Sequence, residues 1–352
     1  MKEGFIIYGC YGYTGKLICD LAVKNGLKPV LAGRDKLKVQ ALAEKLKLQY
    51  RVFDVADEQA VVENIKDFKV VLHCAGPFKF TAQVMALACI KAKTHYLDIT
   101  GEIQVFEQLF KLDVDASLAG VLLMPGVGFD VVPTDCLALY LKEKLPGCNT
   151  LELGLYQKGG KLSHGTAITI AENLGESGAI RRNGKMVQIP NGTLTRYIYV
   201  DQKERNAVAI PWGDISTAYR TTNIPNITVY NILPQKVIDG MKLSNYLGFI
   251  FRRKFVKNYI IKKIKSRPAG PDDEERKAAS SIVWGEVKNP LGASKSAILQ
   301  LPEGYTLTAL TAVKIVQNIL ENPPPHGTRT PASVFGKDFI LQFEGVKRVD
   351  NP

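Results

Sequence analysis

The stretch Phe5-Ile6-Ile7-Tyr8-Gly9-Cys10-Tyr11-Gly12-Tyr13-Thr14-Gly15 joins a short apolar run to three glycines in the spacing GxxGxxG. Continuous apolar character is typical of a parallel strand that is buried on both faces. Glycines let the backbone that follows come close to a pyrophosphate, which binds to the N–H groups at the start of a helix. We therefore expect a dinucleotide to bind at Gly9, Gly12 and Gly15, with a hydroxyl from Thr14. The alternative is a tight turn in which Gly15 only lets the helix pack on the strand.

Outward from this stretch, short apolar runs alternate with segments of helical spacing. The apolar runs are 5–8, 29–32, 51–55, 70–75, 96–99 and 121–124, and the helical segments are about 14–25, 36–47, 57–66, 81–92 and 103–117. This alternation predicts an α/β fold whose core is a doubly wound parallel sheet with helices on both faces.

After about residue 130 the pattern changes to half-exposed strands separated by turn residues. These segments lie near 151–155, 194–200, 206–210, 226–232, 281–287 and 296–301, and a helix is predicted from Thr306 to Leu320. We expect a first domain at 1–130, an α+β domain with a largely antiparallel sheet at 131–326, and a tail, 327–352, that packs back on the first domain.

The end of the second predicted strand bears on the choice of cofactor. Folds that select NAD usually place an acid there to accept the ribose 2′-hydroxyl, whereas this chain has Arg34. A guanidinium matches a 2′-phosphate by bidentate contact, so we expect NADP(H). Asp35 keeps NAD open, although it also suits the N-cap of the next helix. Asp54, after the third strand, is expected at the adenine edge, or else in a turn.

Two further strand ends point toward the same crevice, because ligands of open α/β sheets bind outside the carboxyl ends of the strands. The fourth strand ends in Cys74-Ala75-Gly76-Pro77, where small residues let a dinucleotide pass toward its nicotinamide. The fifth strand is followed by Asp98, Thr100 and Glu102, which we expect in the site. The alternative is that they cap the helix that starts near Glu102.

Motifs along nearly the whole chain carry a family resemblance. They are Tyr8-Gly9-x-x-Gly12-Tyr13-Thr14-Gly15, Ala32-Gly33-Arg34, Cys74-x-Gly76-Pro77-Phe78, Tyr96-x-Asp98-x-Thr100-Gly101-Glu102 and Gly128-Phe129-Asp130-x-x-Pro133-x-Asp135, followed by the shorter Gly165-Thr166, Arg181-Arg182-Asn183-Gly184, Trp284-Gly285-Glu286-Val287 and Gly327-Thr328-Arg329-Thr330-Pro331-Ala332. Together they resemble the saccharopine dehydrogenase-like oxidoreductases, in particular the branch that includes trans-acting enoyl reductases.

The resemblance implies an NADP-binding Rossmann domain followed by a mixed α/β domain that covers the cofactor. It implies cofactor contacts at Gly9, Gly12, Tyr13, Thr14, Gly15 and Arg34, and a nicotinamide side at Gly76, Pro77 and Thr100, next to Ala75. We expect hydride transfer from NADPH to an apolar or acyl-linked (enoyl) substrate, as in lipid metabolism. The alternatives are a saccharopine-type amino-acid dehydrogenase and a non-catalytic protein that binds NADPH or docks at a membrane.

Reduction of an enoyl or imine bond needs a proton as well as a hydride. The candidate proton donors are Tyr13, Asp98, Glu102, Asp130 and His164. A substrate with several carboxylates would need clustered arginines, and Arg181, Arg182, Arg196 and Arg220 are too dispersed in the sequence to decide. The chain has neither a GxSxG elbow nor a P-loop, so acyl hydrolysis and phosphoryl transfer are not supported.

Composition limits the class of protein. The hydrophobic content of 46% and charged content of 23% are globular values. The six cysteines are scattered without a CxxC pair, which argues against disulfides and against a metal site. No apolar run approaches the ~20 residues of a membrane-spanning helix, and no signal-peptide pattern follows Lys2 and Glu3. We expect a cytoplasmic protein, peripherally associated with a membrane if the basic segment described next docks there.

The net charge of +12 is concentrated in one segment, 242–267, which holds nine Lys or Arg and no acid. On one continuous helix, Leu247, Phe251, Phe255 and Tyr259 would form an apolar column. Such a basic amphipathic helix suits an anionic membrane surface or an acidic partner such as an acyl carrier. The alternative is a surface helix whose apolar face is core. Nucleic acid is not expected, because no recognisable binding module accompanies the charge.

Overall fold

The computed structural model describes residues 2–351 and divides the chain into two compact units. The first unit comprises the residues up to Val132 together with Tyr305–Val334, and the second comprises Pro133–Gly304 together with the residues from Phe335 onward. The sequence had suggested cuts at 130 and 326. The chain instead returns to the first unit for two helices and the strand between them before it completes the second unit.

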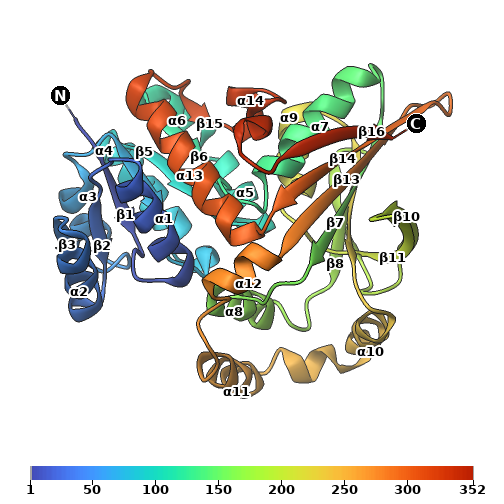
Figure 1. Cartoon of the computed structure of the whole chain (residues 1–352), viewed down its shortest axis with the longest axis horizontal. Coiled ribbons are helices and arrows are strands. Elements are labelled where there is room, and N and C mark those ends of the chain that lie inside the picture. The colour runs from blue at the N-terminus through green and yellow to red at the C-terminus, as the bar shows by residue number, and fades with distance from the viewer. Residues whose placement is uncertain (1, 352) are drawn as a thin grey trace. The chain divides into compact units, whose positions relative to one another are not determined.

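The first unit is built on a seven-stranded sheet in the order β15-β6-β5-β4-β1-β2-β3, in which every pair of strands is parallel. Its strands are β1 (Phe5–Tyr8), β2 (Val30–Gly33), β3 (Tyr50–Val52), β4 (Val70–His73), β5 (His95–Asp98), β6 (Leu122–Met124) and β15 (Gly327–Thr328). Because the chain winds outward from β1 in both directions, right-handed crossovers place helices on opposite faces of the sheet. The predicted doubly wound sheet is confirmed (Figure 1).

The helices of the first unit follow the predicted segments closely. They are α1 (Tyr13–Lys24), α2 (Lys36–Leu46), α3 (Glu58–Ile65), α4 (Ala82–Ala92), α5 (Ile103–Phe110), α6 (Asp113–Ala119), α13 (Gly304–Glu321) and α14 (Pro331–Phe335), with a 3₁₀ turn, η1 (Phe78–Phe80). The single helix predicted over 103–117 is wrong, because it is divided into α5 and α6. The side chain of Asp113, the first residue of α6, accepts a hydrogen bond from the backbone N–H of Thr328. Thr328 lies on β15, the strand that forms after the chain has returned to the first unit.

Hydrogen bonds to the loop after β6 tie α13 to the first unit. The hydroxyl of Thr311 donates to the carbonyl of Val127 at 2.8 Å, and the N–H of Phe129 donates to the hydroxyl of Thr308 at 3.0 Å. These bonds hold α13 against the loop that follows β6. The expected tail, 327–352, is divided: β15 pairs with β6, whereas β16 (Lys347–Asn351) pairs with β14 in the second unit.

The second unit is built on a mixed, mostly antiparallel sheet in the order β10-β11-β12-β7-β13-β14-β16, with β8 and β9 attached to β12. Its strands are β7 (Thr150–Lys158), β8 (Gly178–Arg182), β9 (Lys185–Ile189), β10 (Thr195–Val200), β11 (Lys203–Ala209), β12 (Asn226–Ile232), β13 (Ser280–Lys288), β14 (Ser294–Pro302) and β16. Only β12 and β7 pair in parallel among these described strands. The α+β prediction is confirmed, although β8, β9 and β16 were not predicted.

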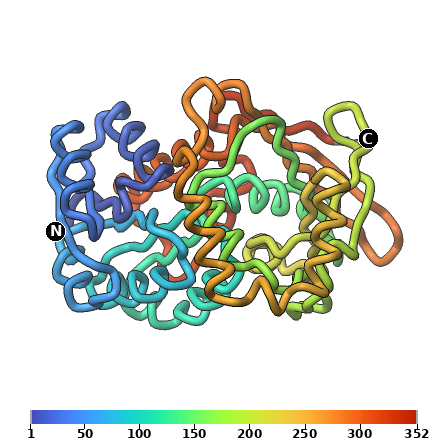
Figure 2. Tube along the Cα trace, turned by 90° about the horizontal axis from the view of Figure 1, so that it is seen from below, coloured from blue at the N-terminus to red at the C-terminus, as the bar shows by residue number. Residues whose placement is uncertain are grey.

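The helices of the second unit connect these strands. They are α7 (Val132–Lys144), α8 (His164–Glu172), α9 (Asp214–Thr222), α10 (Gln235–Phe251), α11 (Lys254–Lys265) and α12 (Asp273–Ala278), and a 3₁₀ turn, η2 (Phe339–Gln342), precedes β16. The trace in Figure 2 shows α10 and α11 along the side that faces the viewer.

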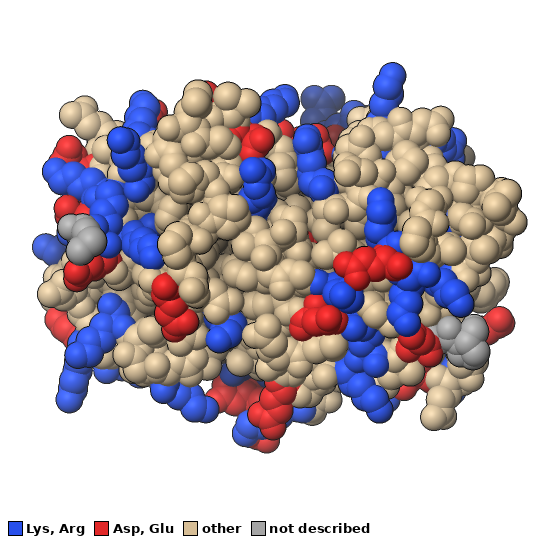
Figure 3. Space-filling view, turned by 90° about the horizontal axis from the view of Figure 1, so that it is seen from above, with Lys and Arg blue, Asp and Glu red and all other residues tan. Residues whose placement is uncertain are grey.

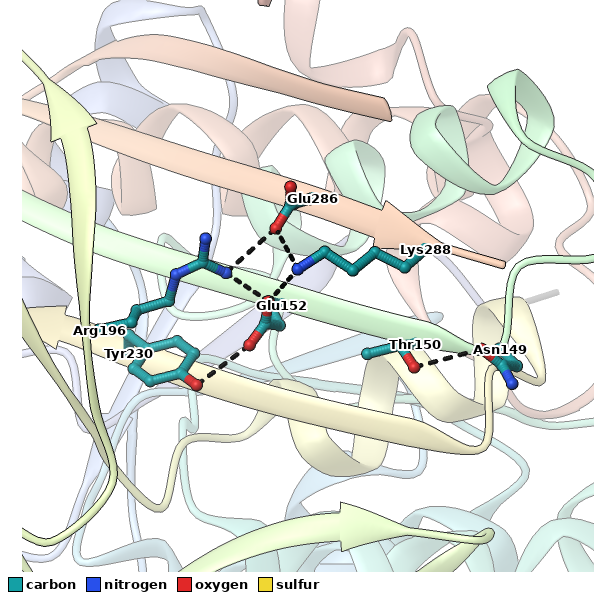
Figure 4. Close-up of polar contacts among 7 residues, drawn as sticks. All are labelled: Asn149, Thr150, Glu152, Arg196, Tyr230, Glu286 and Lys288. Carbon is teal, nitrogen blue, oxygen red and sulfur yellow. Dashed lines mark hydrogen bonds and ion pairs between the residues drawn. The ribbon is translucent and has the colours of Figure 1, made fainter. Parts of the chain in front are cut away.

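A polar cluster crosses the sheet of the second unit (Figure 4). The guanidinium of Arg196 on β10 pairs with Glu152 on β7 and, at 3.1 Å, with Glu286 on β13. Lys288 lies 3.0 Å from Glu286, and the hydroxyl of Tyr230 donates to Glu152 at 3.1 Å. Two cations face two carboxylates, so the charges balance within the cluster and it holds β10 over the neighbouring strands.

Candidate functional site

The glycine loop between β1 and α1 is packed too tightly for side chains. Gly9 has a φ of +84°, and a Cβ there would lie 2.7 Å from the backbone nitrogen of Ala75. A Cβ on Gly15 would lie 2.4 Å from the carbonyl oxygen of Gly9. Gly12 is the N-cap of α1, and the N–H groups of a first helical turn have no acceptor within their own helix. The loop therefore fits a pyrophosphate, which needs a bare backbone at a helix start.

The end of β2 presents an exposed, basic side chain. Arg34 is exposed, and its guanidinium forms no hydrogen bond or ion pair with the rest of the described chain. Asp35 is the N-cap of α2, as predicted, and its carboxylate lies 2.8 Å from the Lys38 ammonium. The hydrogen bond from Lys38 lowers the pKa of Asp35. The acid next to Arg34 is thus engaged locally, and Arg34 is available to a phosphate.

Two residues that the sequence reasoning missed lie beside Arg34. The ring of Tyr11 covers Gly33, where a Cβ would lie 2.5 Å from Tyr11 Cε1, and the ammonium of Lys38 lies 5.7 Å from the centre of that ring. An open pocket of about 310 Å³ is lined by Tyr11, Lys16, Asp20, Lys38, Ala41, Leu42 and Lys45. The sequence signal for Lys38 was its position in the first turn of the helix that follows Arg34.

Asp54 lies in an exposed turn after β3. Its carboxylate accepts a hydrogen bond from the N–H of Ala56 at 3.0 Å, which is the turn geometry that the sequence left as an alternative. A contact of Asp54 with an adenine stays a prediction.

The loops after β4 and β5 are tied together by Glu102. Its two carboxylate oxygens accept from the backbone N–H groups of Phe78 at 2.8 Å and Lys79 at 3.0 Å, while its own N–H donates to the buried hydroxyl of Thr100 at 3.1 Å. Glu102 is the N-cap residue of α5, but its side chain makes no capping bond. The side chain of Glu102 therefore positions the Ala75-Gly76-Pro77 segment.

Asp98 is fully buried and holds the end of β5 in place. One oxygen accepts from the N–H groups of Thr100 and Gly126, both at 2.9 Å, and the other accepts from the hydroxyl of Tyr96 at 2.6 Å. Burial raises the pKa of Asp98 to about 6. With three internal donors around it, this carboxyl orients the loops on either side, and these contacts give no support to the expectation of a catalytic acid.

Asp130 lies against the same loop. A Cβ on Gly101 would lie 2.6 Å from Asp130 Oδ2, so the carboxylate rests on the Gly101 backbone. Burial raises the pKa of Asp130 to about 6. The structure thus brings Asp130 next to the segment formed by Thr100, Gly101 and Glu102, although these residues are far apart in the sequence.

The two remaining proton-donor candidates are Tyr13 and His164. Tyr13 is the first residue of α1, and its ring packs edge-to-face on Tyr305 at 5.1 Å. His164 belongs to the second unit, where it begins α8 and its Nε2 lies 2.8 Å from the carbonyl oxygen of Arg267. Among residues 2–351, no cluster of His, Cys, Asp and Glu is suited to hold a metal ion.

Comparison with known proteins identifies the first unit. Residues 5–124 match the family described as the saccharopine dehydrogenase NADP-binding domain. The mouse saccharopine dehydrogenase-like oxidoreductase is 27% identical over 249 residues, which cover 61% of this chain and 58% of that protein. The chain thus aligns with little more than half the length of this relative. The solved structure of yeast saccharopine dehydrogenase (L-Glu forming) shares the fold, with a TM-score of 0.67 and 13% identity over 99% of this chain and 100% of that one.

Two further relatives carry different names. A lipid droplet localized protein of Caenorhabditis elegans is 22% identical over 96% of this chain and 95% of its own length. A trans-acting enoyl reductase of Mycobacterium ulcerans is 28% identical over 42% of this chain and 37% of its own. The glycine cradle and the family match agree: the first unit matches a saccharopine dehydrogenase NADP-binding domain, and the chain is similar to the saccharopine dehydrogenase-like oxidoreductases.

Proposed function

We propose that this protein is an NADP-dependent oxidoreductase that reduces an apolar or acyl-linked substrate with a carbon–carbon double bond. The observation that carries the proposal is the bare glycine loop at the start of α1 together with the exposed, unpaired Arg34 at the end of β2. When bound, NADPH supplies the hydride. The chain supplies binding, orientation and a proton.

The residues of the first unit have separate roles in this proposal. Gly9, Gly12 and Gly15 leave space for the pyrophosphate, and Thr14 adds its hydroxyl. Arg34 and Lys38 bind the 2′-phosphate beside the ring of Tyr11. Ala75, Gly76 and Pro77 face the nicotinamide, and the buried Thr100 lies behind them on loops that Glu102 and Asp98 hold in position.

Asp130 is the proton donor in this proposal. A carboxyl with a pKa of about 6 keeps a protonated fraction of roughly a tenth at pH 7, which is enough for it to act as a general acid. Its position on Gly101, beside Thr100 and Glu102, supports this assignment.

The substrate class rests on two observations. Arg181 donates to the carbonyls of Ile215 and Gly184 and stacks on Tyr219 at 4.2 Å, and Arg196 is neutralised by two glutamates. Neither arginine is available to a substrate with several carboxylates, which weakens the saccharopine-type alternative.

The relative named as an enoyl reductase supports an acyl-linked substrate. Such a substrate arrives on an acidic acyl carrier or from an anionic membrane, and both would be attracted by the basic segment 242–267.

The test is transfer of deuterium from C4 of NADPH to a panel of enoyl thioesters of increasing chain length. Imines formed from an amino acid and a 2-oxo acid are compared in parallel. Label in the saturated thioester supports the proposal, and label only in the amine product replaces it with saccharopine-type chemistry. Tight NADPH binding without label in any product would indicate a protein that binds the cofactor without catalysis.

A variant pair tests the proton donor. Asp130→Asn should lower kcat on the labelled substrate at least tenfold and leave NADPH affinity unchanged, because the amide cannot give up a proton. Asp115→Asn, an exposed change of the same kind on α6, is the matched control. Equal rates for the two variants would remove Asp130 from the mechanism.

A further inference from the structure

The basic segment 242–267 is not one helix. It covers the end of α10 and all of α11, with a break at Arg252 and Arg253, where Arg253 is extended with a ψ of 128°. The single apolar column predicted along one helix is therefore wrong. Leu247 and Phe251 lie half-buried on α10, whereas Phe255 and Tyr259 lie exposed on α11.

The two helices are anchored to the second unit by their inner sides. Ile238 and Gly248 of α10 are buried, and Gly248 packs on the backbone of Gly175, whose carbonyl accepts from Arg252 Nε at 2.9 Å. On α11, the Lys257 ammonium donates to the carbonyl of Glu172 at the end of α8. These contacts account for the inner sides of the two helices.

The outer sides carry large apolar side chains in the solvent. The exposed fractions are 80% for Tyr246, 64% for Phe249, 73% for Phe255 and 60% for Tyr259, and Leu243 and Ile250 are also exposed. None of the residues Lys254–Lys265 is fully buried. A helix that only covered a core would turn most of these rings inward, so the interpretation of a simple core-covering helix does not hold for α11.

Cations surround these rings without matching acids. Within the segment, Lys242 alone has a described acid in ion-pair range, Asp239 at 3.9 Å. The Lys263 ammonium lies 5.2 Å from the centre of the Tyr259 ring. By contrast, basic and acidic side chains are interspersed on the face shown in Figure 3. The outer sides of α10 and α11 thus combine uncompensated positive charge with exposed aromatic rings.

We propose that this surface, the outer sides of α10 and α11, docks on an anionic phospholipid bilayer. Both helices lie along one face of the second unit (Figures 1 and 2), so their outer side chains can reach one plane together. Lysines and arginines meet the lipid phosphates while Phe249, Phe255 and Tyr259 enter the headgroup region. An acidic protein would satisfy the charge, but it would give the separated rings no common apolar environment. The inference does not depend on the bound cofactor or on the reaction.

Vesicle co-flotation of the full chain tests the proposal. Vesicles of phosphatidylcholine with about a third phosphatidylserine are compared with pure phosphatidylcholine. We expect binding to the anionic vesicles only, weakened by added salt. Replacing three lysines, K254Q/K262Q/K263Q, should weaken binding on the order of 100-fold, since each cation near the surface contributes roughly a fivefold factor. The double variant F255S/Y259S should weaken it while leaving the salt dependence in place.

The matched control is K24Q/K28Q/K111Q, which removes the same charge from exposed positions of the first unit and should bind as the wild type. All variants should keep the NADPH affinity of the wild type, which shows that they fold. Equal binding to neutral and anionic vesicles, or an equal loss for both lysine variants, would overturn the proposal. So would binding to an acidic acyl carrier protein without binding to vesicles.

Discussion

Arg34 is the residue on which the cofactor preference can be tested most directly. Its guanidinium forms no hydrogen bond or ion pair with the described chain and is exposed, so Arg34→Ala removes no internal contact and should leave the free energy of unfolding unchanged. A charged hydrogen bond to the 2′-phosphate contributes about 1.5–3 kcal/mol. Screening at an exposed site, and the continued presence of Lys38, place the expected loss at the lower end of that range.

The expected result is an NADPH affinity about ten times weaker, equivalent to about 1.4 kcal/mol, with NADH affinity unchanged because NADH has no 2′-phosphate. The wild type should bind NADPH at least tenfold tighter than NADH. Nucleotide fluorescence titrated at low and moderate salt measures both affinities. The NADPH difference should shrink as salt rises, since exposed charges are screened.

Lys36→Ala is the matched control, because Lys36 is exposed, carries the same charge and lies two residues from Arg34 at the start of α2. It should change NADPH affinity much less than Arg34→Ala does. An equal loss for NADPH and NADH, or an equal effect of the two substitutions, would refute a specific 2′-phosphate contact at Arg34. Failure of both nucleotides to bind the wild type would refute the reading of the glycine loop.

Three further outcomes follow from the same unit. Gly15→Ala should lower the free energy of unfolding by roughly 1–3 kcal/mol and weaken NADPH binding, because its Cβ meets the Gly9 carbonyl. The control Gly240→Ala has open space around its Cβ and should change neither quantity. Thermal unfolding and nucleotide titration compare the two variants. Glu102→Ala should lower the free energy of unfolding, measured in urea, by about 1–3 kcal/mol, since two backbone N–H groups lose their acceptor. Unchanged stability with lost turnover would make Glu102 catalytic instead. Burial raises the pKa of Asp98 from about 3.8 to about 6, so the folded chain binds the extra proton and stability should fall by roughly 2–3 kcal/mol as the pH rises from about 4 to 7. Asp98→Asn should flatten that fall, and an unchanged pH profile of urea midpoints would contradict the assignment.

Local pattern was a reliable guide in the first unit. The strands predicted at 5–8 and 121–124 correspond to β1 and β6, and Asp35 is the N-cap that its position suggested. Strand burial, helical periodicity and capping all depend on residues within a few positions of one another, so they can be read along the chain.

The errors share a different cause. The predicted helix over 103–117 is divided at Asp113, whose carboxylate meets Thr328, more than two hundred residues away. The helix α13 was assigned to the second domain, but Thr308 and Thr311 bond to the loop after β6. The hydrogen-bond partners of Asp98 and Glu102, which hold the loops after β4 and β5, were not foreseen either, and a role of these two carboxyls in the reaction stays a prediction. Such partners are unknown until the chain has folded.

The doubly wound sheet and the glycine loop follow from the sequence alone, because each depends on spacing between near neighbours, whereas a phosphate contact at Arg34 stays a prediction. The partners of Asp98 and Glu102, the contact of Asp130 with Gly101 and the exposed sides of α10 and α11 are known only from the tertiary structure. Those properties depend on what packs against a side chain in space. A residue type and its position in the chain do not specify that neighbour.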